Sequence, residues 1–232
     1  MSFLIYIQQF TLIDWVLFSI SINLLLFFVS IGFYLIIDKI CPKNPIQKQE
    51  FPIRKSDWFL SLITIIVNSL VLLAAVYLWK THWISVNDSA SYLQIGIEVI
   101  CITIAMDFLM YVFHYLAHLP FFYKAVHSKH HQHVNTNYLS LFVLHPIETF
   151  GFGMMMLFVF ACYDFSIYAI SIYLFVNLIW GTIGHLNKEF FPDWTAKLQL
   201  GTSRFHNQHH SDERCNFGFY TSIWDKLFRT HK

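Results

Sequence analysis

Long apolar runs separated by short polar segments dominate the chain. Three of these runs, at residues 15–37, 59–79 and 95–116, are each about as long as a membrane-crossing helix. A helix needs about 20 apolar residues to cross the roughly 30 Å hydrocarbon core of a bilayer. The pattern therefore predicts three membrane-spanning helices in the first half of the chain.

A fourth apolar stretch, residues 139–182, is too long for one span and is interrupted only near Cys162 and Asp164. This length favours two helices, at about 139–160 and 165–182, that form a tight hairpin. A re-entrant hairpin is the alternative. We therefore expect an all-α integral membrane protein with about four to five transmembrane helices.

The last fifty residues are more polar than the rest and are expected to form a helical cap, mainly outside the lipid. We expect two parts, an N-terminal transmembrane hairpin at residues 1–91 and a catalytic domain at residues 92–232. The N-terminus lacks the basic segment of a secretory signal, so we expect it to stay in the mature chain.

Composition supports the membrane assignment. Of the 232 residues, 56% are hydrophobic and 19% aromatic, whereas only 12% are charged, about half the share typical of soluble domains. The formal net charge is only +1, which gives no indication of nucleic-acid binding.

Lysine and arginine are distributed unevenly over the predicted loops. The loop at residues 38–57 carries five of them, the segment before the fourth span carries Lys124 and Lys129, and the tail carries seven. With five alternating spans these segments fall on one side of the membrane, and only Lys80 falls on the other. The positive-inside rule makes the basic side cytoplasmic. The predicted cap and its histidines therefore face the cytoplasm.

The first histidine pair lies at the end of the third span, in DFLMYVFHYLAH. His114 and His118 are four residues apart, so on a helix they share a face and can bind one metal ion. Asp107 continues the same stripe, and an acid inside an apolar span suggests a functional role. We expect its carboxylate to accept the N–H of a ligating histidine. A helix cap or a polar seam is the alternative.

Two copies of the pattern HxxHH follow, one on each side of the predicted hairpin. Positions i, i+3 and i+4 share a helix face, so each copy is expected to present its three imidazoles together. Composition alone does not explain two copies among 13 histidines in 232 residues. Their histidines are His127, His130 and His131 in the first copy and His206, His209 and His210 in the second.

These eight histidines and His185, in the sequence GHLN after the last span, exceed the needs of one metal ion. Zinc takes four ligands and octahedral iron six, so two metals are expected. An open position on iron would permit catalysis, whereas closed zinc sites would be structural.

Other polar residues have weaker predictions. His133 is expected to be a neighbour of the site rather than a ligand, and His82 and His231 are interpreted as ordinary surface residues. Hydrogen bonds to the ligating histidines are expected from three more residues besides Asp107, namely His145, Asn187 and Asp212.

The order of these motifs resembles the fatty acid hydroxylase superfamily, also called the sterol desaturase family. The resemblance covers roughly residues 95–232 and rests on DFLMYVFHYLAH, VHSKHHQHVNTN, LHPIE, GHLN, RFHNQHH and NFGFYTSIWDKLF. Two positions depart from the family pattern. Glu189 stands where some members carry a further histidine, which leaves a tenth ligand open, and Arg229 replaces a glycine in the closing segment.

The resemblance implies a membrane-bound di-iron oxygenase that hydroxylates or desaturates a C–H bond of a sterol, a fatty acyl chain or an alkyl lipid. It implies two iron ions, with zinc as a substitute, and O2 as co-substrate. It also implies that the eight box histidines, and less securely His185, are the ligands. The spans and boxes occupy nearly the whole chain, so a separate electron donor of the reductase, cytochrome or ferredoxin type is expected.

The residues themselves point in the same direction. An unactivated C–H bond requires a redox metal rather than an acid, a base or a serine nucleophile. The sequence contains no GxSxG, HExxH or glycine-rich phosphate loop. One rival is a metal-binding or metal-transporting membrane protein without redox catalysis, although transporters place their ligands near the bilayer midplane. The other rival is a structural zinc protein.

Overall fold

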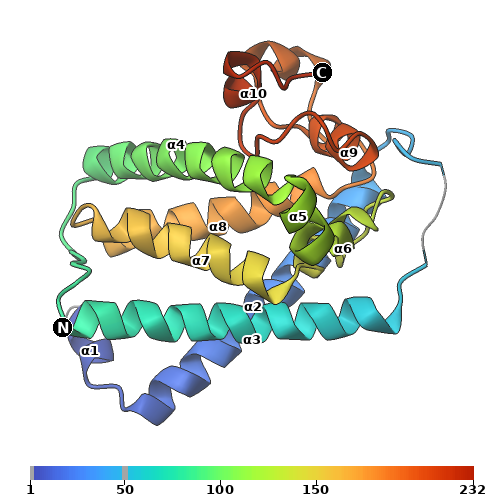
Figure 1. Ribbon diagram of the computed structural model, residues 1–232. Helices are drawn as coiled ribbons and strands as arrows, with labels where there is room; N and C mark the ends of the chain where they lie inside the picture. Colours follow the sequence, from blue (N-terminus) through green and yellow to red (C-terminus); the bar gives the residue numbers. More distant parts are fainter. Residues whose placement is uncertain (1–2, 49–51) are drawn as a thin grey trace.

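The computed structural model describes residues 3–48 and 52–232, and within these ranges it consists of helices joined by loops, without strands. The five long helices form a bundle, and most of the short helices gather at one end of it, whereas the N-terminal helix lies at the other end (Figure 1). The elements in chain order are α1 (Phe3–Gln8), α2 (Leu12–Ile40), α3 (Lys55–Lys80), α4 (Tyr92–Ala117), α5 (Pro120–Phe122), the π-helix η1 (Tyr123–His127), α6 (Ser128–His131), the 3₁₀-helix η2 (Ser140–Phe142), α7 (Pro146–Ala161), α8 (Ile167–Gly184), the 3₁₀-helix η3 (Asp193–Leu198), α9 (Ser203–Ser211) and α10 (Ile223–Leu227).

Four helices, α2, α3, α4 and α8, are long and apolar enough to cross a membrane. Large apolar side chains such as Leu25, Phe28 and Ile66 lie exposed on their outer faces, as expected where the surrounding solvent is lipid. The all-α membrane fold with four to five long apolar helices is confirmed.

The fourth predicted span begins later than expected. Residues 139–145 are not part of α7, which starts at Pro146 and has only 16 residues. His145 precedes it as the N-cap, and Pro146 suits the first helical position because it lacks an N–H. The prediction was wrong for 139–145 because Leu139 and Val143 are buried in a loop, and a buried apolar loop reads like a helix.

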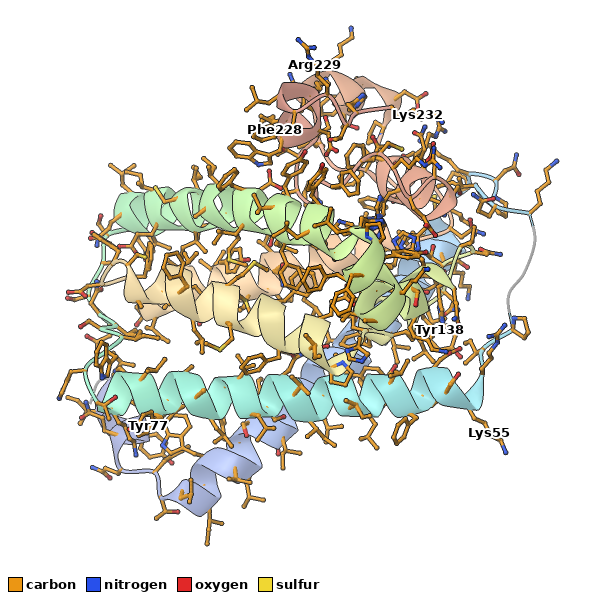
Figure 2. All side chains as sticks on the ribbon, viewed as in Figure 1. Lys55, Tyr77, Tyr138, Phe228, Arg229 and Lys232 are labelled. Atoms are coloured by element: carbon orange, nitrogen blue, oxygen red, sulfur yellow. The ribbon has the colours of Figure 1, made fainter. Side chains whose placement is uncertain are left out.

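The helices alternate in direction, so the end of α2, the start of α3, the end of α4, the start of α7 and the end of α8 lie together. We call this the histidine end of the bundle. Figure 2 shows side-chain nitrogens gathering there. Lys55 marks the end of α3 that belongs to the histidine end, and Tyr77 lies close to the opposite end of α3. Helices α2 and α3 pack on α7 and α8. The division at residue 91 stays a prediction.

The C-terminal segment folds back along the flank of α4. Phe108 and Tyr111 of α4 contact Trp224 and Phe228, with ring centroids 4.9 and 5.4 Å apart. Asp107 anchors the segment by accepting hydrogen bonds from the backbone N–H of Tyr220 and the indole N–H of Trp224 at 2.8 and 3.0 Å. The cap thereby covers the side of the bundle as well as its end.

Candidate metal centre

Nine buried or half-buried histidines form two groups at the histidine end, and within each group the candidate ligand atoms lie within 4.8 Å of one another. The end of α4, the η1–α6 segment, the C-cap of α8 and helix α9 supply them. Group A contains His114, His118, His127, His131 and His209, and group B contains His130, His185, His206 and His210. The structure thus brings together all nine histidines that the sequence singled out.

Each HxxHH motif divides between the two groups, contrary to the expectation that its three imidazoles would act together. His127 and His131 join group A, while His130 points to group B. In α9 the roles are exchanged, since His206 and His210 join group B and His209 joins group A. Residues at i and i+4 share a helix face, whereas the residue at i+3 lies far enough round the axis to reach the neighbouring group.

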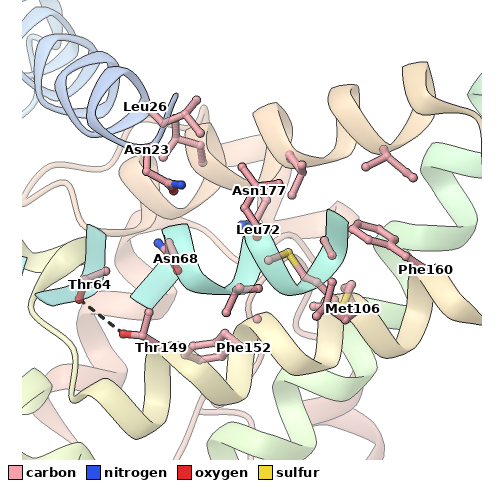
Figure 3. A pocket seen from close by; sticks show the side chains of 18 of the residues that line it. Asn23, Leu26, Thr64, Asn68, Leu72, Met106, Thr149, Phe152, Phe160 and Asn177 are labelled. Atoms are coloured by element: carbon pink, nitrogen blue, oxygen red, sulfur yellow. Dashed lines mark hydrogen bonds between the residues drawn. The ribbon is translucent and has the colours of Figure 1, made fainter. Parts of the chain in front are cut away.

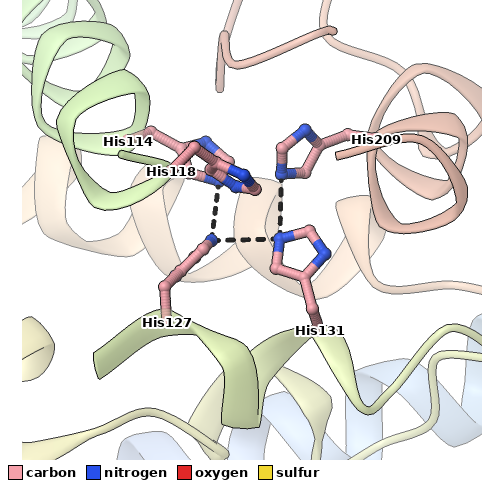
Figure 4. Close-up of side chains that lie close together, drawn as sticks. All are labelled: His114, His118, His127, His131 and His209. Carbon is pink, nitrogen blue, oxygen red and sulfur yellow. Dashed lines mark hydrogen bonds between the residues drawn. The ribbon is translucent and has the colours of Figure 1, made fainter. Parts of the chain in front are cut away.

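The Nε2 atoms converge within each group. In group A, His127 Nε2 lies 3.2 Å from His114 Nε2 and 3.0 Å from His131 Nε2 (Figure 4). His209 Nε2 lies 3.1 Å from His131 Nε2, which continues the chain of short separations. The four residues of group B are spaced similarly, with Nε2 separations of 3.5 Å for His130–His185, 3.3 Å for His185–His206 and 3.1 Å for His206–His210.

Hydrogen bonds at Nδ1 fix the tautomers. His114 Nδ1 donates to the carbonyl of Phe217 at 2.9 Å, and His209 Nδ1 donates to the carbonyl of Cys215 at 2.7 Å. In group B, His185 Nδ1 donates to the carbonyl of Gly181 at 2.7 Å. A carbonyl oxygen can only accept, so in these neutral rings Nδ1 carries the hydrogen and Nε2 presents a lone pair.

Lone pairs that face each other need a cation between them. His127 Nδ1 donates to the Glu148 carboxylate at 2.5 Å, so in the neutral ring His127 Nε2 presents a lone pair toward His114 Nε2, 3.2 Å away. His118 Nε2 is buried and has no hydrogen-bond partner among the described residues, which is costly for a polar atom. Both observations fit metal-ligating histidines, because two neutral rings that carry their hydrogens on Nδ1 cannot hydrogen-bond to each other through Nε2.

Burial favours the neutral form of several of these imidazoles. It lowers the pKa of His118 to about 3 and that of His185 to about 4, because a low-dielectric environment disfavours the charged ring. Burial also holds the pKa of His130, His206, His209 and His210 well below the usual range for histidine. A neutral ring is the form that binds a metal.

Asp107 does not have the role that its position on α4 suggested. Its carboxylate accepts hydrogen bonds from the backbone N–H of Tyr220, the hydroxyl of Thr221 and the indole of Trp224 at 2.8, 2.6 and 3.0 Å. No described histidine donates to it. The alternative of a polar seam is the one observed, and this seam ties the C-terminal segment to α4.

Three other residues expected to hydrogen-bond the ligands also contact different partners. Asn187 pairs with the backbone of Gln47 at 2.8 and 2.9 Å, and Asp212 accepts from Lys232 at 2.7 Å on the surface. His145 Nδ1 accepts from the N–H of Ile147 at 3.3 Å and caps α7. Asn187 and Asp212 therefore stabilise segments next to grouped histidines, whereas His145 stabilises α7, which carries none.

His133 lies outside both groups, in agreement with the prediction that it is a neighbour. Its Nδ1 is 2.9 Å from the hydroxyl of Ser140, and its Nε2 is 3.5 Å from Asp57 Oδ1. Glu189, where a tenth ligand was left open, accepts from the backbone N–H groups of Phe191 and Arg204, both at 3.0 Å. Its carboxylate is therefore occupied at the start of α9.

Glu148 is the functional residue that the sequence reasoning missed. It is buried, lies in the first turn of α7, and is the one carboxylate in the described residues that accepts from a grouped histidine. The sequence held a signal, because an acid in the apolar stretch LHPIE is costly to bury. However, a carboxylate is also stabilised in the first turn of a helix, and this position alone was enough to explain why an acid occurs there.

An apolar cavity of about 600 Å³ leads from the two groups into the middle of the bundle. Figure 3 shows part of the lining of this cavity. Histidines of both groups, among them His114 and His130, line one end of it. Its walls are mainly aliphatic and aromatic side chains of α2, α3, α7 and α8. Its volume lies within the range of small-molecule sites, so the arrangement can present an apolar molecule to two metal ions.

Comparisons with known proteins agree with this geometry. The family model described as "Fatty acid hydroxylase" matches residues 99–230, more than half of the chain. The resemblance found in the sequence is thereby confirmed. No solved structure matches the chain significantly.

Curated relatives cover several named activities. The chain is 27% identical to Protein CER1-like 2 of Arabidopsis thaliana, over 72% of this chain and 28% of the relative. It is 27% identical to cholesterol 25-hydroxylase of Mus musculus, over 64% of this chain and 53% of the relative. A Delta(7)-sterol 5(6)-desaturase of Eremothecium gossypii is 25% identical, over 59% of this chain and 38% of the relative. The chain therefore spans about a quarter to a half of these relatives' lengths.

Proposed function

Because the chain belongs to the fatty acid hydroxylase family, we propose that it is a membrane-bound oxygenase that hydroxylates or desaturates a lipid C–H bond with O2. The observation that carries the proposal is the pair of histidine groups at the end of an apolar cavity. The names of two relatives point to a sterol as the substrate.

Two iron ions are the proposed cofactors. Group A would hold one through five imidazoles and group B the other through four. Octahedral iron takes six ligands, so either group would leave at least one position free on iron, whereas four-coordinate zinc would already be saturated by either group. Bound iron supplies the redox chemistry that O2 activation needs and that amino-acid side chains lack.

The chain's own residues orient the ligands and shape the site. The carbonyls of Phe217, Cys215 and Gly181 hold three rings with Nε2 directed inward. Glu148 retains the Nδ1 proton of His127 and makes that ring more electron-rich. The apolar walls exclude water and admit a hydrocarbon chain from the bilayer.

We place the metal site at the cytoplasmic face. The loops at the histidine end, together with the cap that extends from it along α4, hold all lysines and arginines except Lys80, and basic loops face the cytoplasm. A separate electron donor of the reductase, cytochrome or ferredoxin type would dock at this end, where the histidines lie closest to the aqueous phase.

Metal content and lipid oxidation test the proposal together. Anaerobically purified protein should contain two irons per chain, with Mössbauer spectra of nitrogen-ligated iron. Supplied with O2 and an electron donor, it should oxidise membrane lipids, and His130→Ala and His209→Ala should each lose at least 90% of this activity. His231→Ala, at the surface, is the matched control. Full activity in the two ligand variants, or metal-ion flux in proteoliposomes without lipid oxidation, would overturn the proposal.

A further inference from the structure

Three asparagines interrupt the apolar wall of the cavity in the middle of the bundle. Asn23 of α2, Asn68 of α3 and Asn177 of α8 all line it (Figure 3). Polar side chains inside membrane helices are costly unless they pair with something. If the hydrogen-bonding atoms of the three amides all have partners within the protein, the asparagines have only a structural role. Atoms without partners would indicate a ligand.

Two of the amides are half-occupied, in complementary ways. Asn23 Nδ2 donates to the backbone carbonyl of Ser19 at 2.8 Å, which leaves its Oδ1 free to accept. Asn177 Oδ1 accepts from the hydroxyl of Tyr220 at 2.6 Å, which leaves its Nδ2 free to donate. Asn68 has no hydrogen-bond partner among the described residues and offers both a donor and an acceptor.

The two threonines near the histidine end of the cavity have partners, whereas Glu148 accepts from His127 through Oε1 and leaves Oε2 without a partner among the described residues. The Thr64 hydroxyl donates to the carbonyl of Phe142 at 2.9 Å. The Thr149 hydroxyl lies 3.4 Å from the Thr64 hydroxyl. No lysine or arginine is among the residues that line the cavity in the described chain, and Glu148 is already paired with His127. A charged headgroup would therefore be buried without a counter-ion, at a high cost in free energy.

The asparagines lie at a distance from the histidines. Asn177 precedes His185 by eight residues on α8, which corresponds to about 12 Å along the helix axis. Asn68 lies one turn beyond Thr64 on α3, about 6 Å further from the histidine end. A group held by the asparagines would therefore be remote from the atoms that react.

From this geometry we propose that the three asparagines bind the hydroxyl group of a neutral lipid alcohol. The alcohol lies with its hydrocarbon portion toward the histidines, so the bond that is oxidised is remote from the hydroxyl. A hydroxyl both donates and accepts, which matches the free Oδ1 of Asn23, the free Nδ2 of Asn177 and the unpaired Asn68. The proposal rests on the proposed lipid oxidation and narrows its substrate class.

Binding under anaerobic conditions, where no lipid is oxidised, tests the recognition step. The full-length, iron-loaded protein in nanodiscs is titrated with tritiated 1-hexadecanol and cholesterol, and with hexadecane and palmitate as competitors. Both probes share an aliphatic hydroxyl, and their relative affinity distinguishes a long-chain from a sterol source. We expect an alcohol to bind about three- to ten-fold more tightly than hexadecane, the value of about one net hydrogen bond.

Variants locate the recognition group. Asn68→Leu should abolish the preference for the alcohol over hexadecane, and Asn68→Gln should retain part of it. Trp15→Phe is the matched comparison, because Trp15 Nε1 is a buried donor without a partner among the described residues at the other end of the cavity. Thermal melting confirms that each variant is folded.

Four results would overturn the inference: equal affinity for hexadecane and both alcohols, tighter binding of palmitate, loss of the preference in Trp15→Phe but not in Asn68→Leu, or oxidation at the carbon that bears the hydroxyl. If the preference holds and depends on Asn68, the recognition step stands even where iron-loaded protein oxidises no lipid. In that case the proposed function alone fails.

Discussion

At the scale of single residues, the partner of a buried acid decides its role. Asp107 and Glu148 both lie in apolar stretches, yet one binds the C-terminal segment and the other binds a grouped histidine. Asp107 shares a helix stripe with His114, whereas its partners Tyr220 and Trp224 come from more than 100 residues further along the chain. A local pattern indicates that such an acid matters, but the tertiary fold selects its partner.

Replacing Glu148 should weaken metal binding in group A. Glu148→Leu removes the acceptor for His127 Nδ1, so we expect metal affinity to fall on the order of 10- to 100-fold. Glu148→Gln keeps an acceptor oxygen and should have a smaller effect. Competition with a calibrated chelator measures both affinities. Equal affinity in the wild-type and Glu148→Leu proteins would contradict this role.

At the scale of elements, apolar composition predicted α2, α3, α4 and α8 because each is one long run that faces lipid on the outside. The start of α7 was predicted too early because the loop before it is apolar and buried, like a helix in the bundle. All nine grouped histidines were identified from the sequence, but the division of each motif was not. That division depends on how η1–α6 and α9 are rotated against each other, which is a tertiary property.

The contact between α3 and α7 offers a direct test of this packing. A Cβ atom at Gly153 of α7 would lie 2.5 Å from Val71 Cγ2 of α3, so Gly153→Ala should cost about 1–3 kcal/mol of stability. Adding Val71→Ala should restore part of the loss by making room. Denaturation in detergent, followed by tryptophan fluorescence, measures these changes.

Gly96→Ala is the matched control for Gly153→Ala. It lies in another long helix, α4, with nothing within 4 Å of the added Cβ, and should leave stability unchanged or raise it by up to about 1 kcal/mol. An equal loss in the two alanine variants would contradict the packing argument.

At the scale of the whole molecule, the histidine groups join parts of the chain that are distant in sequence. Group A connects α4, η1–α6 and α9, and group B connects α6, α8 and α9. Their closely spaced lone pairs repel one another until a cation is present. The bound ions should therefore stabilise the tertiary fold as well as create the site.

Removing the metals should lower the thermal stability of the protein. An ion present at about 1,000 times its dissociation constant stabilises the native state by roughly 4 kcal/mol. For a chain of this size the melting temperature should then fall by about 10 °C. Differential scanning fluorimetry before and after chelation measures the change. His231→Ala should show the same fall and His130→Ala a smaller one, whereas an unchanged melting temperature would show that the groups bind no ion.

The divided motifs have a consequence for how the protein is loaded. Because η1–α6 and α9 each serve both groups, the first ion to bind orders segments that the second also requires and reduces the entropy that the second must lose. The two binding events are then positively cooperative. At limiting iron supply, the population divides into empty and fully loaded molecules, with few that carry a single, catalytically incomplete ion.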